Sequence, residues 1–354
     1  MEIKKTLNQL TMQIKWVTDI YIKGDDKVSI RTNWELIYNF DTTDWKEIIR
    51  IWNVHLKDFL VENLKRYKLT YIDFEKNKKF DFKYSINNQE YRVNVSISKW
   101  KLLLIFRILK TTILDINELW IDKHVLKWIL NQNQGLFLVS WPTWSWKSTT
   151  LSSIVNHYNI NYNKHIITLE NPIEQVYIDK KSVVHQFELW DDFNSFEDWM
   201  DNILRQDPDI IVIWEIRDQN TLDVALRLAE TWHLVFWTIH WKWANWIVWK
   251  IIRMYENEKQ ITWILADVLI WILYQQKFVI ETGETIVCVE TLYNSTEVKA
   301  GFHQWKYNEF FSNMQTWWDN YMTTMEQYLD NYLQKIYKLS AKDQININNK
   351  VKWL

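Results

Sequence analysis

The sequence predicts an α/β fold in which a smaller α+β domain precedes a larger domain built on a parallel sheet. The chain has 354 residues, and one core seldom grows beyond about 250–300 residues, so two domains are expected. Short strand-like and helical stretches alternate in the first hundred or so residues, whereas short apolar strands alternate with helices after Gly135. We expect residues 1–112 to form the first domain and residues 113–354 the second.

Strands and one long helix are expected in the first domain. Four segments have strand-like patterns, at residues 19–22, 28–32, 80–86 and 91–97. The last two alternate in polarity with period two around Asn87 and Asn88, which is typical of a β-hairpin. Residues 44–65 carry apolar side chains at helical spacing, so a helix is expected there.

The second domain has the pattern of a sheet with helices on both faces. Its expected strands are short apolar segments at residues 136–139, 165–169, 210–213 and 234–236. A turn-rich loop and a helix over residues 147–158 follow the first strand, and strands that alternate with helices form parallel sheets. Residues 111–120 have the pattern of a linker. The last ~60 residues are expected to be mostly helical, with residues 322–337 the clearest amphipathic piece.

Composition excludes several classes of protein. The formal net charge is −2 without a long run of one sign, so the sequence has no electrostatic footprint for nucleic acid. The single cysteine, Cys288, excludes an intrachain disulfide and a four-cysteine zinc site. No apolar run approaches ~18 residues, and the first residues lead into no apolar signal segment. We therefore expect a cytoplasmic protein without direct membrane insertion.

Tryptophan and glycine have abnormal frequencies. The chain contains 25 Trp and 4 Gly, together 29 of 354 residues, and this sum of about 8% is close to the ordinary share of glycine alone. Many of these tryptophans lie where turns are expected, whereas tryptophans usually bury a large apolar area in cores and interfaces. Some bacterial lineages read the codon UGA as glycine, and translating such a gene with a code that reads UGA as tryptophan produces this exchange. We interpret many of the tryptophans as UGA-encoded glycines.

A phosphate-binding loop is predicted directly after the first strand of the second domain. With glycine at Trp141, Trp144 and Trp146, the chain satisfies the pattern G-x-x-x-x-G-K-[ST] between a strand and a helix. Backbone N–H groups of such a loop surround the phosphates in conformations that only glycine adopts cheaply. The expected nucleotide-binding residues are Trp141, Pro142, Thr143, Trp144, Ser145, Trp146, Lys147, Ser148 and Thr149. With indoles in the loop, the chain should not bind ATP.

Two of these residues have side chains suited to specific parts of a nucleotide. Lys147 would reach the β- and γ-phosphates, and the hydroxyl of Ser148 would ligate Mg²⁺. ATP and Mg²⁺ are therefore the expected cofactors.

Four segments carry motifs in a fixed order, at residues 143–151, 168–174, 207–218 and 229–240. They resemble the Walker A, Asp box, Walker B and His box of the secretion ATPase superfamily, with the nearest resemblance to the type IV pilus retraction (twitching motility) ATPases. Residues 16–22 and 31–36 resemble the PAS-like amino-terminal domain of that family. The resemblance implies a RecA-like P-loop NTPase domain behind a smaller PAS-like domain. Reading tryptophan as glycine supplies a family glycine at positions 16, 34, 190, 214 and 232.

The resemblance also implies catalytic roles for matching residues. Glu215, after the Walker B strand, would orient or activate the attacking water. Glu170, in the Asp box, would be a second carboxylate that acts through Mg²⁺. His233 and His240 would sense the γ-phosphate and couple it to movement.

Three arginines complete the expected site. Arg92 and Arg107 of the first domain match basic residues that reach ATP across a domain or subunit boundary, in the manner of arginine fingers. Arg217 would support the acidic cluster around the nucleotide.

As a whole, the resemblance implies a homo-hexameric motor whose ATP hydrolysis drives pilus retraction. Its expected partner is an inner-membrane pilus platform protein, which would place the motor at the inner membrane without insertion. The absence of a four-cysteine zinc element favours retraction over extension, although Asn171 replaces the usual aspartate of the Asp box. Two alternatives remain open. One is a related type II secretion, DNA-uptake or accessory pilus ATPase, and the other is a nucleotide-incompetent scaffold if the tryptophans are real.

Overall fold

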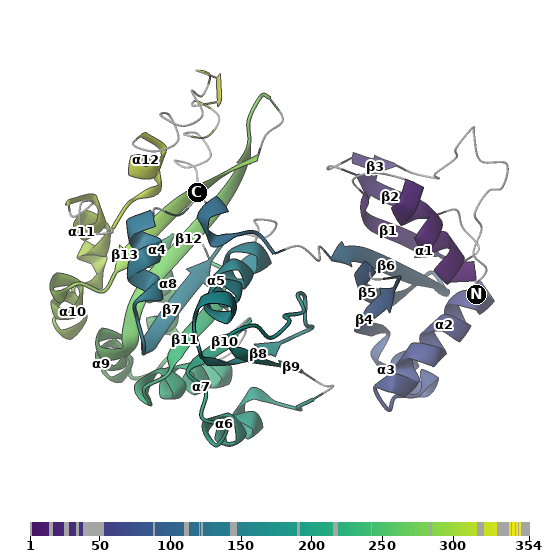
Figure 1. Ribbon diagram of the computed structural model, residues 1–354, viewed down its shortest axis with the longest axis horizontal. Coiled ribbons are helices and arrows are strands. Elements are labelled where there is room, and N and C mark those ends of the chain that lie inside the picture. The colour runs from purple at the N-terminus through teal and green to yellow at the C-terminus, as the bar shows by residue number, and fades with distance from the viewer. Residues whose placement is uncertain are drawn as a thin grey trace. The chain divides into compact units, whose positions relative to one another are not determined.

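The computed structural model divides the chain into two compact units (Figure 1). The first unit comprises Met1–Thr112 with Pro172–Val176, and the second comprises Ile113–Asn171 with Tyr177–Leu354. The structure describes residues 2–13, 17–24, 28–32, 35–37, 53–87, 89–109, 113–119, 121, 123–141, 147–189, 192–214, 219–241, 243–282, 285–316, 322–330, 340, 342–343, 345 and 347. Among the helices in these ranges, none has the length and apolar character needed to cross a membrane.

The first unit is built on a six-stranded antiparallel sheet with the strand order β3-β2-β1-β6-β5-β4. Its strands are β1 (Val17–Lys23), β2 (Ser29–Thr32), β3 (Glu35–Ile37), β4 (Lys79–Ile86), β5 (Gln89–Ser98) and β6 (Lys101–Leu109). Its helices are α1 (Glu2–Gln13), α2 (Asn53–Arg66) and α3 (Tyr71–Asn77). The expected hairpin is confirmed, because Ile86 and Gln89 pair on either side of the turn.

Alternating residues of this sheet face a core that the helices cover. Tyr91, Val93 and Val95 of β5 are buried together with Leu56 and Leu60 of α2. Of the helix expected over residues 44–65, residues 53–65 are seen in α2, and residues 44–52 lie outside the described residues. The opposite face of the sheet therefore presents the intervening, more polar residues of each strand.

The second unit is built on a seven-stranded sheet with the order β13-β12-β7-β11-β10-β8-β9. Its strands are β7 (Gly135–Ser140), β8 (His165–Glu170), β9 (Val183–Glu188), β10 (Ile210–Ile213), β11 (Leu234–Ile239), β12 (Leu269–Val279) and β13 (Thr285–Tyr293). All neighbours are parallel except β13, which pairs antiparallel with β12. The predicted parallel sheet is confirmed, with an antiparallel edge strand that the sequence did not indicate.

Both faces of this sheet are covered by helices, as predicted. Phe137 and Val139 of β7 face one core, and Leu136 and Leu138 face the other. The helical elements of this unit are η1 (Ile116–Glu118), α4 (Lys123–Leu130), α5 (Lys147–Asn161), α6 (Phe196–Leu204), α7 (Gln219–Glu230), α8 (Ala244–Arg253), α9 (Glu258–Val268), α10 (Thr296–His303), η2 (Tyr307–Glu309), α11 (Phe310–Thr316) and α12 (Met325–Tyr328). Helices α4 and α5 supply the first core, and helices α6 to α11 supply the second.

Two sequence expectations need correction or lie partly outside the described residues. The expected linker over residues 111–120 is instead partly packed, because Ile116 and Leu119 are buried in the second unit. Ile116 begins the 3₁₀ turn η1 and Leu119 directly follows it. These two apolar side chains pack the turn against α5. The amphipathic helix expected over 322–337 begins only at Met325, as α12, because Thr323 forms a β-bridge with Thr291 instead, and residues 331–337 lie outside the described ranges.

Several tryptophans have backbone conformations that favour glycine. The left-handed region is occupied by Trp100, Trp232, Trp243 and Trp305, with φ between 59° and 69°. For a bulky residue this region costs free energy, because Cβ crowds the backbone carbonyl, and glycine has no Cβ. Trp100 is also 95% exposed and Trp232 80% exposed, so burial of the indole does not offset that cost. These positions support the interpretation of tryptophan as glycine.

Candidate functional site

Four motif-bearing segments leave the seven-stranded sheet at the same edge. Strands β7, β11, β10 and β8 are neighbours in that order and run parallel (Figure 1). Their carboxyl ends, at Ser140, Ile239, Ile213 and Glu170, therefore lie along one edge. Ligands of open parallel sheets bind beyond the carboxyl ends of the strands. We call this the carboxyl edge of the sheet.

The predicted phosphate loop connects β7 to α5 at this edge. Strand β7 ends at Ser140 and helix α5 begins at Lys147, so the strand–loop–helix context is confirmed. Residues 142–146 lie outside the described residues, as do the side chains of Lys147 and Ser148. Helix α5 is joined to β12 by its second turn, since Thr150 Oγ1 and the Gln275 side chain exchange hydrogen bonds of 3.0 and 2.9 Å. The loop is thus anchored at both of its ends.

Trp141 and His240 face each other where β7 and β11 end. Their ring centroids are 5.7 Å apart, and the planes meet edge to face at 84°. The Trp141 side chain is only 1% exposed, so its indole fills the space at the start of the loop. Glycine at position 141 would open that space directly beside His240.

Glu170 is held at the end of β8 by side-chain donors. Its Oε1 accepts hydrogen bonds from Thr168 Oγ1 at 2.8 Å and from Gln186 Nε2 at 2.9 Å. The residue is fully buried, and a buried carboxylate is stable when such donors satisfy it. A carboxylate at this edge is one of the oxygen donors that Mg²⁺ prefers.

The end of β10 is clamped between its two neighbours. The Trp214 amide donates to the Leu169 carbonyl oxygen at 3.0 Å, and Thr238 Oγ1 of β11 donates to the Trp214 carbonyl oxygen. Glu215 follows directly, although Glu215 and Arg217 lie outside the described residues. The backbone that leads to Glu215 is therefore fixed at the carboxyl edge.

The structure does not bring His233 to this edge, which corrects the expectation that both histidines sense one phosphate. His233 precedes β11 and His240 follows it, and seven extended residues span ~23 Å at ~3.3 Å each. The His233 carbonyl accepts from the Gly135 amide at the start of β7, and its ring lies 3.0 Å from the Leu228 carbonyl oxygen. These contacts tie the end of α7 to the start of the strand, which is a structural role.

Arg92 and Arg107 lie side by side on the first unit. They are directly opposite each other on β5 and β6, so both project from the face of the sheet that the helices leave uncovered. Arg107 Nε donates to Asp19 Oδ1 at 2.9 Å, and Asp19 is buried while Arg107 is about half exposed. Arg92 lies 3.8 Å from Glu174 Oε1, so each of the two guanidinium groups has a carboxylate partner.

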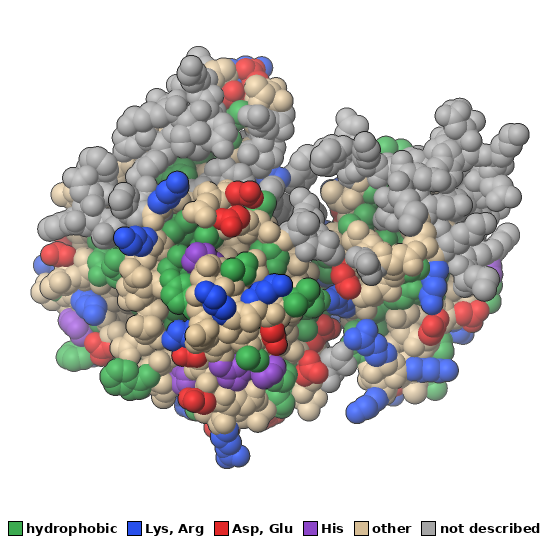
Figure 2. Space-filling model, in the orientation of Figure 1, with side chains coloured by type: hydrophobic (Ala, Val, Ile, Leu, Met, Phe, Trp, Pro, Cys, Tyr) green, Lys and Arg blue, Asp and Glu red, His purple; other side chains and the backbone are tan. Residues whose placement is uncertain are grey.

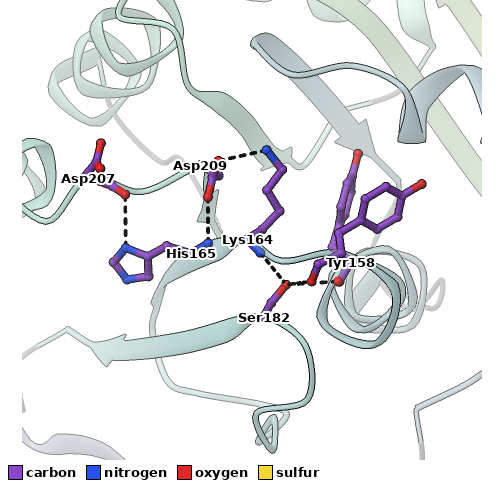
Figure 3. Close-up of polar contacts among 7 residues, drawn as sticks. Tyr158, Lys164, His165, Ser182, Asp207 and Asp209 are labelled. Carbon is purple, nitrogen blue, oxygen red and sulfur yellow. Dashed lines mark hydrogen bonds and ion pairs between the residues drawn. The ribbon is translucent and has the colours of Figure 1, made fainter.

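The opposite, amino edge of the large sheet carries a different polar cluster (Figure 3). Asp209 accepts from Lys164 Nζ at 2.9 Å and from the His165 amide at 2.8 Å. Ser182 Oγ donates to the carbonyl oxygens of Tyr158 and Tyr162. Histidine side chains gather on the visible face of this unit in Figure 2. All these bonds join strand starts to nearby loops and helix ends.

Sequence reasoning missed three polar residues at the carboxyl edge. Ser140 and Gln275 are buried and bonded to site segments, and Glu290 of β13 is fully buried. The only sequence signal for Ser140 was a hydroxyl at the end of an apolar strand, just before the loop. For Gln275 and Glu290 the signal was a polar residue inside an otherwise strand-like stretch.

Comparison with known proteins places this arrangement among secretion motors. Residues 73–285 match the family described as type II/IV secretion system protein. The chain is 32% identical over 266 residues to a twitching motility protein of Neisseria gonorrhoeae, covering 74% of this chain and 71% of that protein. It is 30% identical over 280 residues to the type IV pilus retraction ATPase PilT of Pseudomonas aeruginosa, covering 78% and 81%.

A solved structure extends the similarity to nearly the whole chain. The crystal structure of the pilus retraction motor PilT with bound ADP superposes with a TM-score of 0.84 at 27% identity, covering 98% of this chain and 97% of that one. The ATPase DotB of Legionella pneumophila has the same fold, with a TM-score of 0.79 at 21% identity and coverage of 98% and 94%.

Proposed function

Because the chain belongs to the type II/IV secretion system protein family, we propose that it is an ATPase that powers retraction of a type IV pilus. The observation that carries this proposal is the meeting of four motif segments at one edge of the parallel sheet. The similarity of the whole fold to an ADP-bound retraction motor supports it.

Nucleotide binding falls to the loop between β7 and α5. Backbone N–H groups of residues 143–149 surround the phosphates, and the amino end of α5 adds positive partial charge. Lys147 reaches the β- and γ-phosphates. Ser148 and Glu170 have the hydroxyl and carboxylate oxygens that would hold Mg²⁺, which offsets phosphate charge when bound.

Hydrolysis requires an oriented water molecule in line with the γ-phosphate. Glu215 orients this water, whose oxygen forms the new bond to phosphorus while the bond to the ADP oxygen breaks. The water proton passes to the carboxylate or to phosphate. His240, at the end of the neighbouring strand β11, contacts the γ-phosphate and reports its loss to the loop that follows.

Arginines balance the charge that develops on the phosphate. Arg92 and Arg107 act from the first domain, of the same or a neighbouring subunit, and Arg217 supports the acidic residues of the Walker B segment. Six copies would form a ring that acts on an inner-membrane pilus platform protein and removes pilin from the base of the fibre.

Glycine at positions 141, 144 and 146 is part of this proposal. The buried indole of Trp141 lies against His240, in the space that phosphate and loop backbone need. UGG codons at the three positions would contradict the recoding interpretation. They would favour the second candidate, a nucleotide-incompetent scaffold that assembles with active paralogues.

The test compares two forms of the full chain, one as printed and one with glycine at positions 141, 144 and 146. We expect the glycine form to bind a fluorescent ATP analogue and hydrolyse ATP, and the printed form to do neither. Glu215→Gln in the glycine form should retain nucleotide and lose at least about 100-fold in kcat. Unchanged turnover in that variant would refute the role of Glu215, and absence of binding in the glycine form would refute the ATPase proposal.

A further inference from the structure

The short segment that joins β11 to α8 carries His240 and is held by two buried side chains. The segment comprises residues 240–243, of which 242 lies outside the described residues. One buried side chain comes from β7, directly before the phosphate loop, and the other from β13. The first bonds to the backbone of the segment, and the second bonds to the backbone amide of Ala244, the residue that directly follows the segment.

Ser140 makes the first of these attachments. Its Oγ donates to the Trp241 carbonyl oxygen at 2.7 Å and accepts from the Trp241 amide at 3.2 Å. Ser140 is fully buried, so the two bonds do not compete with water. One hydroxyl thus satisfies both backbone groups of the residue that follows His240.

The residue before His240 is attached to the same point. Ile239 is the register partner of Ser140 in the ladder between β11 and β7. The backbone on both sides of His240 is therefore tied to the last residue of β7. Any displacement of the phosphate loop that moves Ser140 must move His240 with it.

Glu290 makes the second attachment. Its Oε1 accepts from the Ala244 amide, the first residue of α8, at 2.7 Å, and its Oε2 accepts from the Met325 amide at 3.4 Å. The residue preceding α8, Trp243, supplies no side-chain cap. A buried carboxylate from another strand thus caps this helix, where a negative charge is favoured by the unpaired N–H groups and the dipole.

We propose that Ser140 and Glu290 are positioning residues that hold His240 beside the phosphate loop and make the His240 segment follow the state of the nucleotide. The inference rests on the proposed ATPase function. The bonds involve only the backbone of residues 241 and 244, so they do not depend on whether position 241 or 243 is tryptophan or glycine. Ser140 links the His240 segment to the start of the phosphate loop, and Glu290 links the end of that segment to β13.

The test measures amide hydrogen exchange and ATP turnover in the glycine-containing full chain. Ser140→Ala should speed exchange of the residue-241 amide about tenfold, since its acceptor is lost. It should also lower kcat about tenfold while KM for ATP changes less than about twofold, because positioning rather than binding is lost. Ser140→Thr keeps the hydroxyl and should restore both values to within about threefold of the parent. Glu290→Leu, which removes both acceptor oxygens, should speed exchange at Ala244 without a comparable effect at 241.

Ser182→Ala is the matched control (Figure 3). Ser182 is also a buried serine whose hydroxyl bonds to backbone oxygens, but it lies at the amino edge. It should lower the melting temperature as Ser140→Ala does and leave kcat and exchange at 241 unchanged.

Three outcomes would overturn the inference: unchanged exchange at 241 in Ser140→Ala, equal loss of kcat in Ser182→Ala, or failure of the threonine variant to restore kcat. If the parent chain hydrolyses no ATP, the proposed function fails. The exchange rates at 241 and 244 then still decide whether the two anchors exist.

Discussion

The two edges of the seven-stranded sheet use buried polar side chains in different ways. At the carboxyl edge, Ser140 bonds to Trp241, which follows β11 and is 101 residues away, and Thr150 bonds to Gln275 of β12, which is 125 residues away. At the amino edge, Lys164 and Asp209 join the starts of adjacent strands, and Ser182 bonds to the end of the preceding helix (Figure 3). The same kinds of group thus link segments around the predicted site at one edge and join strand starts to neighbouring chain at the other.

The difference follows from the direction of the strands. In a parallel sheet every connection leaves at the carboxyl edge, where loops and helix amino termini are free to meet a ligand. The amino edge receives chain that returns from helices, and its polar groups mainly satisfy backbone. The two histidines that flank β11, His233 and His240, therefore have unrelated surroundings.

The largest expected effect separates these two histidines. In the glycine-containing chain, His240→Ala should lower kcat about 100-fold, because it removes the group that we propose contacts the γ-phosphate. His233→Ala should change kcat less than about twofold and lower the free energy of unfolding by about 1 kcal/mol, since a bond to the Leu228 carbonyl disappears. Steady-state ATPase assays and urea unfolding measure both. An equal loss of kcat in the two variants would contradict the assignment of His240 to catalysis and of His233 to the scaffold.

A buried carboxylate at the carboxyl edge should make stability depend on pH. Burial raises the pKa of Glu290 from 4.5 to about 7, against the opposing bonds from the Ala244 and Met325 amides. Because the folded chain keeps this proton after the unfolded chain has lost it, the stability present below pH 4.5 is lost as pH rises to about 7. The free energy of unfolding should fall by about 3 kcal/mol over this window.

Glu290→Gln isolates that contribution, because glutamine does not titrate. The free energy of unfolding of both chains can be measured in urea at a series of values from about pH 4 to about pH 8. It should depend less on pH in the variant than in the parent chain. Parallel profiles for the two chains would show that Glu290 titrates in the folded protein as it does in water.

The amino edge should respond to pH in the opposite sense. Burial tends to raise the pKa of Asp209, but hydrogen bonds from the His165 amide and Lys164 outweigh it, and the net pKa is lowered. Asp209→Asn should cost about 1 kcal/mol of unfolding free energy at neutral pH, a value reduced because the ion pair is partly exposed. This difference should shrink as pH falls below 3.8, where the unfolded-state carboxyl becomes protonated. ATPase kcat should not change in Asp209→Asn. A lower kcat in this variant would contradict the purely structural role of the amino edge.

The smallest effect concerns the tryptophans with left-handed backbone. Trp100→Gly should raise the free energy of unfolding by about 0.5–1 kcal/mol, because the strain of φ 67° is relieved and the indole is 95% exposed. Trp246 is a control in the first turn of α8, also exposed. Its change to glycine should lower stability by about 1 kcal/mol. Thermal and urea unfolding of the two variants should therefore shift in opposite directions.

Sequence patterns were sufficient to predict the central strands of the large sheet, and they were weak for the strands toward its two sides. Strands β7, β8, β10 and β11 are buried on both faces, so each reads as a short apolar run. Strand β9 contains His185 and Gln186 and lies at an edge, and β12 contains Gln275. The burial of Gln275 is possible because Thr150, 125 residues away, pairs with it. No local pattern carries that information.

Motif order along the chain was enough to identify the family. The phosphate loop and the roles of Lys147, Ser148, Glu170 and Glu215 stay predictions from the same motifs. These motifs are local, because a loop that surrounds phosphate needs its residue types within a few positions. The composition also indicated that many tryptophans stand for glycines. The left-handed backbone at Trp100 and Trp305 supports the same interpretation at two positions that no motif covers.

The folded arrangement alone established which groups of different strands meet. It separated His233 from His240, although both belong to one motif, because an extended strand carries its two ends to opposite edges of a sheet. It also joined Ser140 and Glu290 to the segment after His240. Such contacts depend on strand order and register, which arise from packing across the whole domain rather than from neighbouring residues in the chain.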